Sequence, residues 1–182
     1  MSLLSLENTA FLIVDIQEKL IKAQFEPERV IKNASIMAEA AKILSLPIVV
    51  SEQYPDGLGR TIEEIKIKLP ADAIFFEKRS FSCCAENGFL DMIKNLKKSQ
   101  FFVCGIESHI CVHQTVYQLI KNGFEVHIAE DAISSRKEAN FKLGISRMTS
   151  YGAVLSCVET GLFELLKCTR DLRFKQIQAL IK

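Results

Sequence analysis

Three side chains that could take part in catalysis stand where apolar segments of the sequence end. Asp15 closes the run AFLIVDI, Lys78 ends IFFEK, and Cys111 follows QFFVCGI after a short polar stretch. A thiol can attack a carbonyl carbon, and a carboxylate can take the thiol proton and return it to a leaving group. A neighbouring lysine and the start of a helix, which Cys111 is expected to open, both favour the thiolate. Together the three residue types predict nucleophilic catalysis by a cysteine.

Each of these residues also has an ordinary structural explanation. Asp15 could cap a helix or a turn, Lys78 could be a solvated surface lysine, and Cys111 could be a small buried hydrophobe. The catalytic interpretation therefore depends on the combination, and it requires a fold that brings the three residues to one place.

Short apolar runs alternate with helical patterns along the chain. The expected strands are residues 10–16, 47–53, 73–78, 100–106, 125–131 and 153–158, and the expected helices are residues 27–44, 86–96, 111–123, 137–152, 159–167 and 172–181. Apolar strands separated by helices indicate a parallel sheet covered on both faces. Sites in such sheets lie outside the carboxyl ends of the strands, which is where Asp15, Lys78 and Cys111 fall. Cys104 lies inside the fourth strand and is expected to be buried and inert.

The composition limits the classes of function. The 182 residues are expected to form one domain, residues 1–182, with 48% hydrophobic residues. Lys and Arg number 23 against 22 acidic residues, a net charge of +1, which gives no reason to expect nucleic acid or a membrane surface as partner. The start MSLLSLENTAFLIVDIQ lacks the features of a signal peptide, and no apolar segment approaches the ~20 residues of a membrane span. A cytoplasmic protein with six free thiols is expected.

Five motifs make the chain similar to a known family. VDIQ, SEQYPDGLGRT, EKRSFS, CGIESHICV and AEDAISSR resemble, in this order, the isochorismatase-like cysteine hydrolase superfamily. The tail RFKQIQALIK resembles the branch of isochorismatase domain-containing proteins, so the similarity runs from near residue 8 to the end. It implies a Rossmann-like, three-layer α/β/α fold with a six-stranded parallel sheet, and a catalytic triad of Asp15, Lys78 and Cys111.

The resemblance also implies a non-proline cis peptide between Ile106 and Glu107. Such a bond would turn the Glu107 N–H toward the Cys111 N–H, and two backbone donors there would form an oxyanion hole. Candidates for lining the substrate pocket are Gln17, Phe81 and His109, which stand near the triad in sequence, and Gln53, which ends the second expected strand.

The sequence departs from two relatives in ways that affect the chemistry. Nicotinamidases of the superfamily carry an Asp-x-His metal motif after the second strand, whereas this chain has SEQYPDGLGRT there and no histidine. His109 and His113 have a spacing that can bind metal on a helix, but no third ligand is near in sequence. No metal and no cofactor are therefore expected. Isochorismatase proper lacks the nucleophilic cysteine that this chain has at Cys111, so its vinyl-ether reaction is not expected either.

The function that these patterns favour is a metal-independent cysteine hydrolase. It would cleave a small amide or a related C–N bond of a small-molecule substrate through a thioester. A catalytically silent binding or scaffolding protein is the alternative, because a fold does not by itself establish a function. A redox thiol protein is a third possibility and would need a second cysteine near Cys111.

A homo-oligomer, a dimer or larger, is expected because the resemblance implies one. The tail agrees with this, since Leu172, Ile177, Leu180 and Ile181 could form an apolar helical stripe that docks on a neighbouring subunit. The same stripe could equally dock on the core of its own chain.

Overall fold

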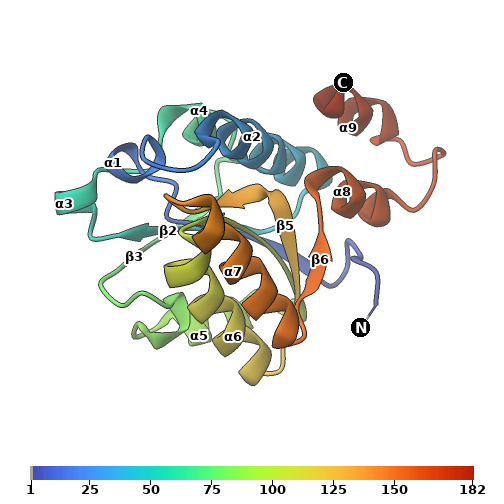
Figure 1. Ribbon diagram of the computed structural model, residues 1–182. Coiled ribbons are helices and arrows are strands. Elements are labelled where there is room, and N and C mark those ends of the chain that lie inside the picture. The colour runs from blue at the N-terminus through green and yellow to red at the C-terminus, as the bar shows by residue number, and fades with distance from the viewer. Residues whose placement is uncertain (1) are drawn as a thin grey trace.

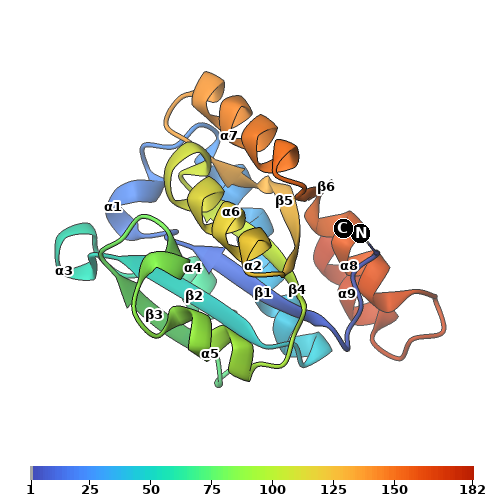
Figure 2. The same ribbon diagram turned by 90° about the horizontal axis from the view of Figure 1, so that it is seen from below.

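Helices cover both faces of a six-stranded sheet in the computed structural model, which describes residues 2–182 (Figure 1). All strand pairs are parallel, and the order across the sheet is β3-β2-β1-β4-β5-β6 (Figure 2). The strands are β1 (Thr9–Val14), β2 (Ile48–Gln53), β3 (Ile74–Lys78), β4 (Gln100–Ile106), β5 (Glu125–Ser134) and β6 (Val154–Ser156). The predicted three-layer fold with a six-stranded parallel sheet is confirmed.

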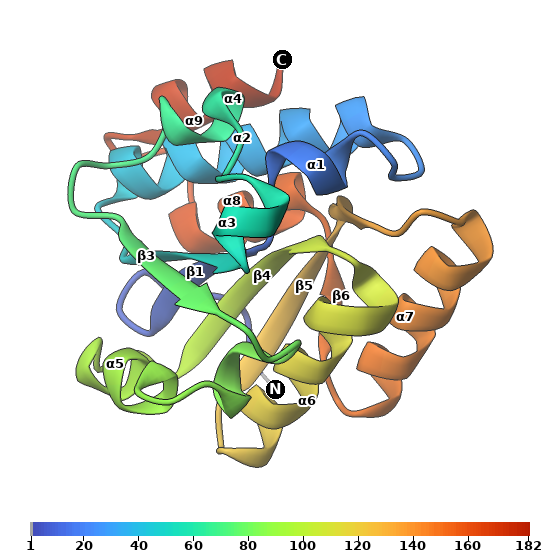
Figure 3. The ribbon, with the colours of Figure 1, turned by 90° about the vertical axis from the view of Figure 1, so that its left-hand side faces the viewer.

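The longer helices form the two outer layers. Figure 3 shows α2 (Pro27–Leu44), α8 (Val158–Leu166) and α9 (Phe174–Ile181) on one side of the sheet. On the other side lie α5 (Phe89–Asn95), α6 (His113–Lys121) and α7 (Glu138–Ser150). The sequence patterns do not predict three short α-helices, which are α1 (Glu18–Ile21), α3 (Pro55–Leu58) and α4 (Glu63–Lys66). They also do not predict a 3-10 helix, Cys83–Ala85, or a π-helical turn, Ser108–Val112.

Helix α2 shows how the sequence pattern produces a covering layer. It begins at Pro27, whose fixed φ suits the first helical turn. Its buried residues recur at helical spacing and form one apolar face: Val30, Ala34, Met37, Ala38, Ala40, Ala41 and Leu44. That face packs on β1, β4 and β5.

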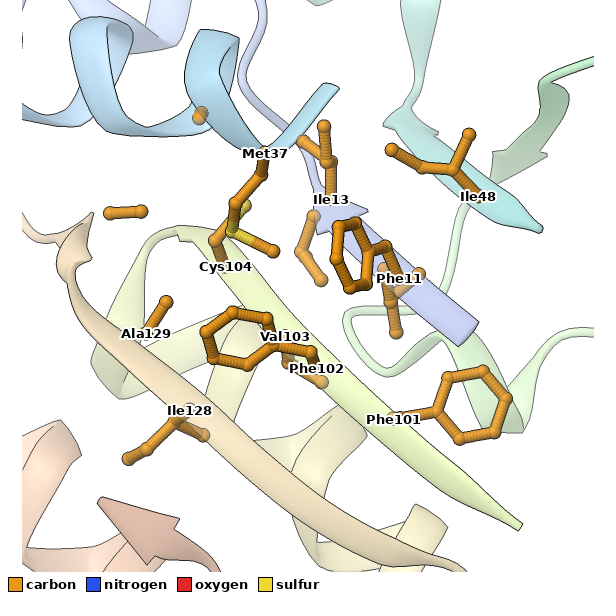
Figure 4. Close-up of a cluster of buried hydrophobic side chains, with 14 of the residues drawn as sticks. Phe11, Ile13, Met37, Ile48, Phe101, Phe102, Val103, Cys104, Ile128 and Ala129 are labelled. Atoms are coloured by element: carbon orange, nitrogen blue, oxygen red, sulfur yellow. The ribbon is translucent and has the colours of Figure 1, made fainter. Parts of the chain in front are cut away.

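The core lies between α2 and the central strands (Figure 4). Every residue of β1 and β4 is buried, as expected for strands that are covered on both faces. The rings of Phe11 and Phe102 meet edge to face with centroids 5.6 Å apart. Cys104 points toward Met37 in this cluster and is fully buried, so the predicted burial of Cys104 is confirmed.

Gly105 allows β4 to end close beside β1. Its φ is +131°, and a Cβ atom there would lie 2.1 Å from the carbonyl oxygen of Val14. Any other residue would collide with the β1 backbone and would be strained at this φ. The glycine therefore permits the ends of β1 and β4 to lie side by side, and Asp15 follows Val14 directly.

The C-terminal helix docks on its own chain. Ile177 is fully buried, and α9 packs against α2 and α8. Leu180 and Ile181 are partly buried against the same core, whereas Leu172 is 98% exposed. Of the two possibilities for the tail stripe, the core of its own chain takes up Ile177, whereas Leu172 and the exposed parts of Leu180 and Ile181 leave docking on a neighbouring subunit a prediction.

None of the helices in residues 2–182 combines the length and the apolar character that crossing a membrane requires.

Candidate active site

The fold brings the three candidate catalytic residues to the carboxyl edge of the sheet. Asp15 follows β1, Lys78 is the last residue of β3, and Cys111 lies in the turn that follows β4. Strands β1 and β3 are both neighbours of β2, and β4 lies on the other side of β1. Residues distant in sequence thus meet at one point of the sheet, as the strand-end rule predicts.

Asp15 and Lys78 form a buried ion pair. Lys78 Nζ lies 2.6 Å from Asp15 Oδ2, and both side chains are completely inaccessible to solvent. The Ser51 hydroxyl donates to the other carboxylate oxygen, Oδ1, at 2.6 Å. Burial lowers the pKa of Lys78, but the attraction of Asp15 and smaller contributions from Cys83 and Cys111 together hold it above its ordinary value. A buried pair of this kind contributes little net stability compared with apolar residues, so its presence at a strand edge indicates a functional site.

The Lys78 ammonium has further acceptors around it. It donates to Gln53 Oε1 at 2.7 Å and to the carbonyl oxygens of Phe81 and Ser80 at 3.0 and 3.3 Å. Gln53 in turn donates from Nε2 to the carbonyl of Arg79 at 2.7 Å. The segment after β3 therefore wraps around the ammonium and fixes its position.

Cys111 lies in a π-helical turn, Ser108–Val112, and α6 begins two residues later at His113. The expectation that Cys111 opens the helix is therefore wrong, because the chain makes one wider turn first. Only 7% of the residue is exposed. Burial raises the pKa of the Cys111 thiol and Asp15 raises it further, while Lys78 lowers it. The expectation that the surroundings favour the thiolate therefore holds for Lys78 only, since burial and Asp15 oppose the charged form, and the thiol needs a base when it attacks.

A second thiol shares this environment. Cys83 is fully buried, and its N–H donates to Thr115 Oγ1 at 3.0 Å. Burial raises the pKa of Cys83 to about 11; Asp15 adds to the rise and Lys78 counteracts it. The same two charges thus act on Cys83 and on Cys111, and all six cysteines are free thiols. Cys83, rather than Cys104, is the thiol that a redox interpretation would have to use.

The peptide between Ile106 and Glu107 is cis, as the resemblance implies. The Glu107 carboxylate is held by Arg136, whose backbone N–H and side-chain Nε donate to Oε2 at 3.0 and 3.1 Å. These bonds tie the end of β4 to the segment that follows β5.

Helix α7 supports the turn that carries Cys111. Ser108 shares a hydrogen bond of 2.6 Å with the hydroxyl of Ser135. A Cβ atom on Gly144 would lie 2.5 Å from Ser108 Oγ and 2.8 Å from the His109 nitrogen. Only glycine lets α7 approach the turn this closely, so the position of the turn depends on this packing.

The predicted pocket residues fall into two groups. The side chain of Gln17 is used in hydrogen bonds within the protein. It accepts from the Gln53 N–H at 2.7 Å and donates to the carbonyls of Gln53 and Gly59 at 3.0 and 2.6 Å. His109 contacts Ser135 through Nδ1 at 2.9 Å and is partly buried. Phe81 is 57% exposed and is the one of the four that presents a free side chain. A role for these four in binding substrate stays a prediction.

Sequence reasoning missed four contributors to this region: Ser51, Cys83, Thr115 and Arg136. Ser51 had a detectable signal, because it is a hydroxyl in the apolar run IVVS, and its strand pairs with β1 opposite Val14. The other three had none, since their contacts join segments 29 to 32 residues apart whose packing no local pattern specifies.

A protein metal site needs several ligating side chains close together in space. Within residues 2–182, no group of three or more His, Cys, Asp or Glu side chains could hold a metal ion. Independence from metal nevertheless stays a prediction until it is measured.

The fold and the edge site define a Rossmann-like α/β protein with a buried carboxylate–lysine pair beside a cysteine. Residues 9–160 match the model of the Isochorismatase domain, and the chain belongs to the isochorismatase family. Isochorismatase domain-containing protein 2 of Danio rerio is 35% identical over 179 residues, which are 98% of this chain and 89% of that protein. The secreted isochorismatase effector Isc1 of Phytophthora sojae is 33% identical over 178 residues, covering 96% of this chain and 85% of the effector. The predicted branch is thereby confirmed.

Solved structures agree with the fold. A structure described as MAR1 ribonuclease from Caenorhabditis elegans superposes with a TM-score of 0.94 at 34% identity, over 99% of this chain and 92% of the other. YcaC from Escherichia coli is described as an octameric hydrolase of unknown specificity. It superposes with a TM-score of 0.93 at 24% identity, over 100% of this chain and 90% of the other. Family membership supports a hydrolase-type fold.

Proposed function

We propose that the protein is a metal-independent cysteine hydrolase that cleaves a small amide or a related C–N bond through a thioester. The observation that carries the proposal is the buried pair of Lys78 Nζ and Asp15 Oδ2, 2.6 Å apart, whose two charges both act on the Cys111 thiol. A nucleophile, a base and a cation that orients the base are the minimum for this chemistry.

The first half of the reaction forms the thioester. Cys111 Sγ attacks the carbonyl carbon while its proton passes to Asp15. Asp15 then gives this proton to the leaving nitrogen, the C–N bond breaks, and the amine departs. The raised pKa of Cys111 supports transfer of the proton during attack rather than a thiolate formed in advance.

The second half releases the acid. Asp15 takes a proton from water, the hydroxide attacks the thioester carbon, and the proton returns to Cys111 as the C–S bond breaks. Lys78 donates a hydrogen bond to Asp15 Oδ2 and keeps this carboxyl group in position between the proton transfers. The N–H groups of Glu107 and Cys111 would stabilise the oxyanion in both halves, and one such donor contributes about 3 kcal/mol to lowering the barrier.

A screen of small amides, ureides and nitriles for release of amine or ammonia tests the proposal. The Cys111→Ala variant is the control for each active compound. Mass spectrometry of the enzyme quenched during turnover should show the acyl group on Cys111. Turnover that persists in Cys111→Ala would overturn the assignment.

The screen should include an RNA arm, because several similar structures are described as MAR1 ribonucleases. The nearly neutral net charge of +1 gives this chain little electrostatic attraction for RNA, so we expect no cleavage. RNA cleavage lost in Cys111→Ala would replace the amidase proposal. No turnover of any compound, together with slow alkylation of Cys111, would favour the binding or scaffolding alternative.

We also propose that the chain forms a homo-oligomer. The support is the description of the Escherichia coli YcaC structure as octameric, although the tail helix of this chain is occupied by its own core. Light scattering at micromolar concentration checks this, since one chain has a mass of 20.5 kDa. A species of that mass alone would refute it.

A cytoplasmic location is likewise a proposal. The Phytophthora sojae relative is named a secreted effector, so location can differ within the family. Cell fractionation with an antibody against the protein decides the matter.

A further inference from the structure

A second cavity lies between α6 and α7. It has a volume of about 330 Å³, and its lining residues are His113, Gln114, Tyr117, Gln118, Arg147 and Tyr151. None of the candidate catalytic residues belongs to this set. The two helices pack against each other on the side of the sheet opposite α2 (Figure 3).

Aromatic rings form much of the cavity wall. Tyr117 and Tyr151 meet edge to face with centroids 5.1 Å apart. The His113 ring is tilted by 37° to Tyr151 at 6.4 Å. Such a wall favours a planar ring as occupant, because aromatic pairs gain from edge-to-face and offset-stacked contacts beyond the area they bury.

Arg147 is an exposed residue that gives the cavity a positive charge without an ion pair in the described part of the chain. Its Nε donates to the Tyr151 hydroxyl at 2.7 Å. Within residues 2–182 its two terminal amino groups have no acceptor, and it forms no ion pair. None of the six lining residues is acidic. A second cation, Lys121, lies with Nζ 5.8 Å from the Tyr117 ring centre.

His113 does not supply a negative or a competing positive group. Burial lowers the pKa of His113, and the charge of Arg147 lowers it further, so both disfavour the charged form of the ring. Its Nδ1 is buried without a hydrogen-bond partner in the described part of the chain. The cavity therefore combines flat aromatic walls, one free guanidinium and two amides.

We propose that this cavity is a binding site for a small planar aromatic carboxylate. The guanidinium fork of Arg147 matches a carboxylate in bidentate geometry, and the ring of the ligand lies against Tyr117 and Tyr151. The volume is near the lower end of ligand sites, which suits a compound with a single ring.

The cavity connects to the candidate active site through one hydrogen bond. Gln118 accepts from the Ser82 hydroxyl at 2.5 Å. Ser82 follows Phe81, whose carbonyl oxygen accepts from Lys78. Binding in the cavity does not require the proposed hydrolase activity, so the two proposals can fail separately.

The tyrosines provide a direct test. The chain has three of them, and Tyr117 and Tyr151 line the cavity while Tyr54 lies after β2 beside Arg79. Benzoate is titrated into the protein carrying ring-¹³C tyrosine at pH 7.5, with resonances assigned through Tyr→Phe variants. We expect saturable shifts for Tyr117 and Tyr151 but not for Tyr54, with a Kd of about 1 mM, reasonable for so small a ligand.

Two ligand controls and two variants sharpen the result. Benzyl alcohol keeps the ring without the charge and cyclohexanecarboxylate keeps the charge without the aromatic ring, so each should bind at least about tenfold more weakly. Arg147→Gln should weaken the binding of benzoate by about tenfold or more. Lys142→Gln, an exposed change on the same helix, should leave the affinity unchanged. An unchanged Tyr54 resonance shows that each variant is folded.

Three outcomes would overturn the proposal. Equal shifts with benzoate and with benzyl alcohol would show that the charge of the ligand plays no part in binding. Unchanged affinity in Arg147→Gln would place the ligand elsewhere. Absence of any shift at benzoate concentrations up to about 20 times the expected Kd would show that the cavity is closed or is covered by a second copy of the chain.

Discussion

Strand β4 and the turn that follows it each carry a buried cysteine, but only the cysteine in the turn lies beside charged groups that could assist catalysis. Cys104 is fully buried among apolar side chains next to Met37 (Figure 4). Cys111 is nearly as buried, with 7% exposure, yet it lies next to a fully buried ion pair. Burial raises the pKa of both thiols, so depth alone does not distinguish them.

Their surroundings make the difference. Besides burial, the charge acting on Cys104 is that of Asp131, which raises its pKa further. Cys111 has a carboxylate that can accept its proton and a lysine that lowers its pKa. A buried polar group can take part in catalysis only where partners stabilise its charged form, and parallel sheets provide such partners at the strand ends.

Replacing the two cysteines tests this comparison with the largest expected effect. Cys111→Ala should abolish amide hydrolysis, because it removes the nucleophile. Cys104→Ala should keep turnover per folded molecule and lower the free energy of unfolding by about 1 kcal/mol, since it leaves a small cavity. Turnover and urea unfolding are measured on both. Equal loss of turnover at equal folded fraction would contradict the assignment.

Lys78→Met tests whether the ion pair with Asp15 stabilises the carboxyl edge of the sheet. The change leaves the Asp15 carboxylate buried without its cation, which should lower the free energy of unfolding by about 3–5 kcal/mol at pH 7. Because folding raises the pKa of Lys78, the stabilisation is complete below its ordinary value of 10.5 and is lost as the pH rises through the raised value.

Urea unfolding of the wild type and of Lys78→Met from pH 7 to 11 provides the measurement. Arg79→Met is the matched control, since Arg79 is exposed and should contribute less than about 1 kcal/mol through its contact with Tyr54. A Lys78→Met protein as stable as this control would show that the buried pair does not hold the edge together.

Gly144→Ala tests the support of the turn from α7. The added methyl would overlap Ser108, so we expect a loss of about 1–3 kcal/mol in unfolding free energy, with a displaced turn and reduced turnover. Ser146→Ala, an exposed change in the same helix, is the control and should have little effect. A Gly144→Ala enzyme with normal stability and turnover would mean that the turn holds its position without this packing.

Alkylation of Cys111 by iodoacetamide distinguishes the two charges that act on it. Asp15 raises the pKa of the thiol and Lys78 lowers it, so Asp15→Asn should move the pH profile of alkylation downward and Lys78→Met should move it upward. In the Asp15→Asn variant, Cys111 would then be alkylated faster at pH 7, although the variant would have no hydrolase activity. The rate is followed by mass spectrometry of the peptide containing Cys111. Shifts in the same direction would refute the assigned roles.

Dialysis against a strong chelator is expected to have the smallest effect, namely none. The metal-binding histidine motif of the related nicotinamidases is missing from SEQYPDGLGRT. Activity lost on chelation and restored by zinc would mean that the site uses a metal after all.

The sequence predicted the strands and larger helices well because their apolar residues have a clear period. Strands β1, β2 and β4 lie within about two residues of their expected bounds. The helices α1, α3 and α4 were not predicted, since each has four residues and no period can be recognised over so short a length. The single-domain organisation of residues 1–182 stays a prediction, which one cooperative unfolding transition would support.

The sequence by itself determined the alternation of strand and helix, and with it the parallel sheet whose edge collects Asp15, Lys78 and Cys111. It also carried the motifs by which the family is recognised. Only the tertiary structure decided that Cys111 lies in a π-helical turn, that burial and Asp15 raise the pKa of its thiol, and that Ser51, Cys83 and Thr115 surround the site. The physical reason is that a pKa and a hydrogen bond depend on groups close in space, whereas periodicity records only which face of each element is buried.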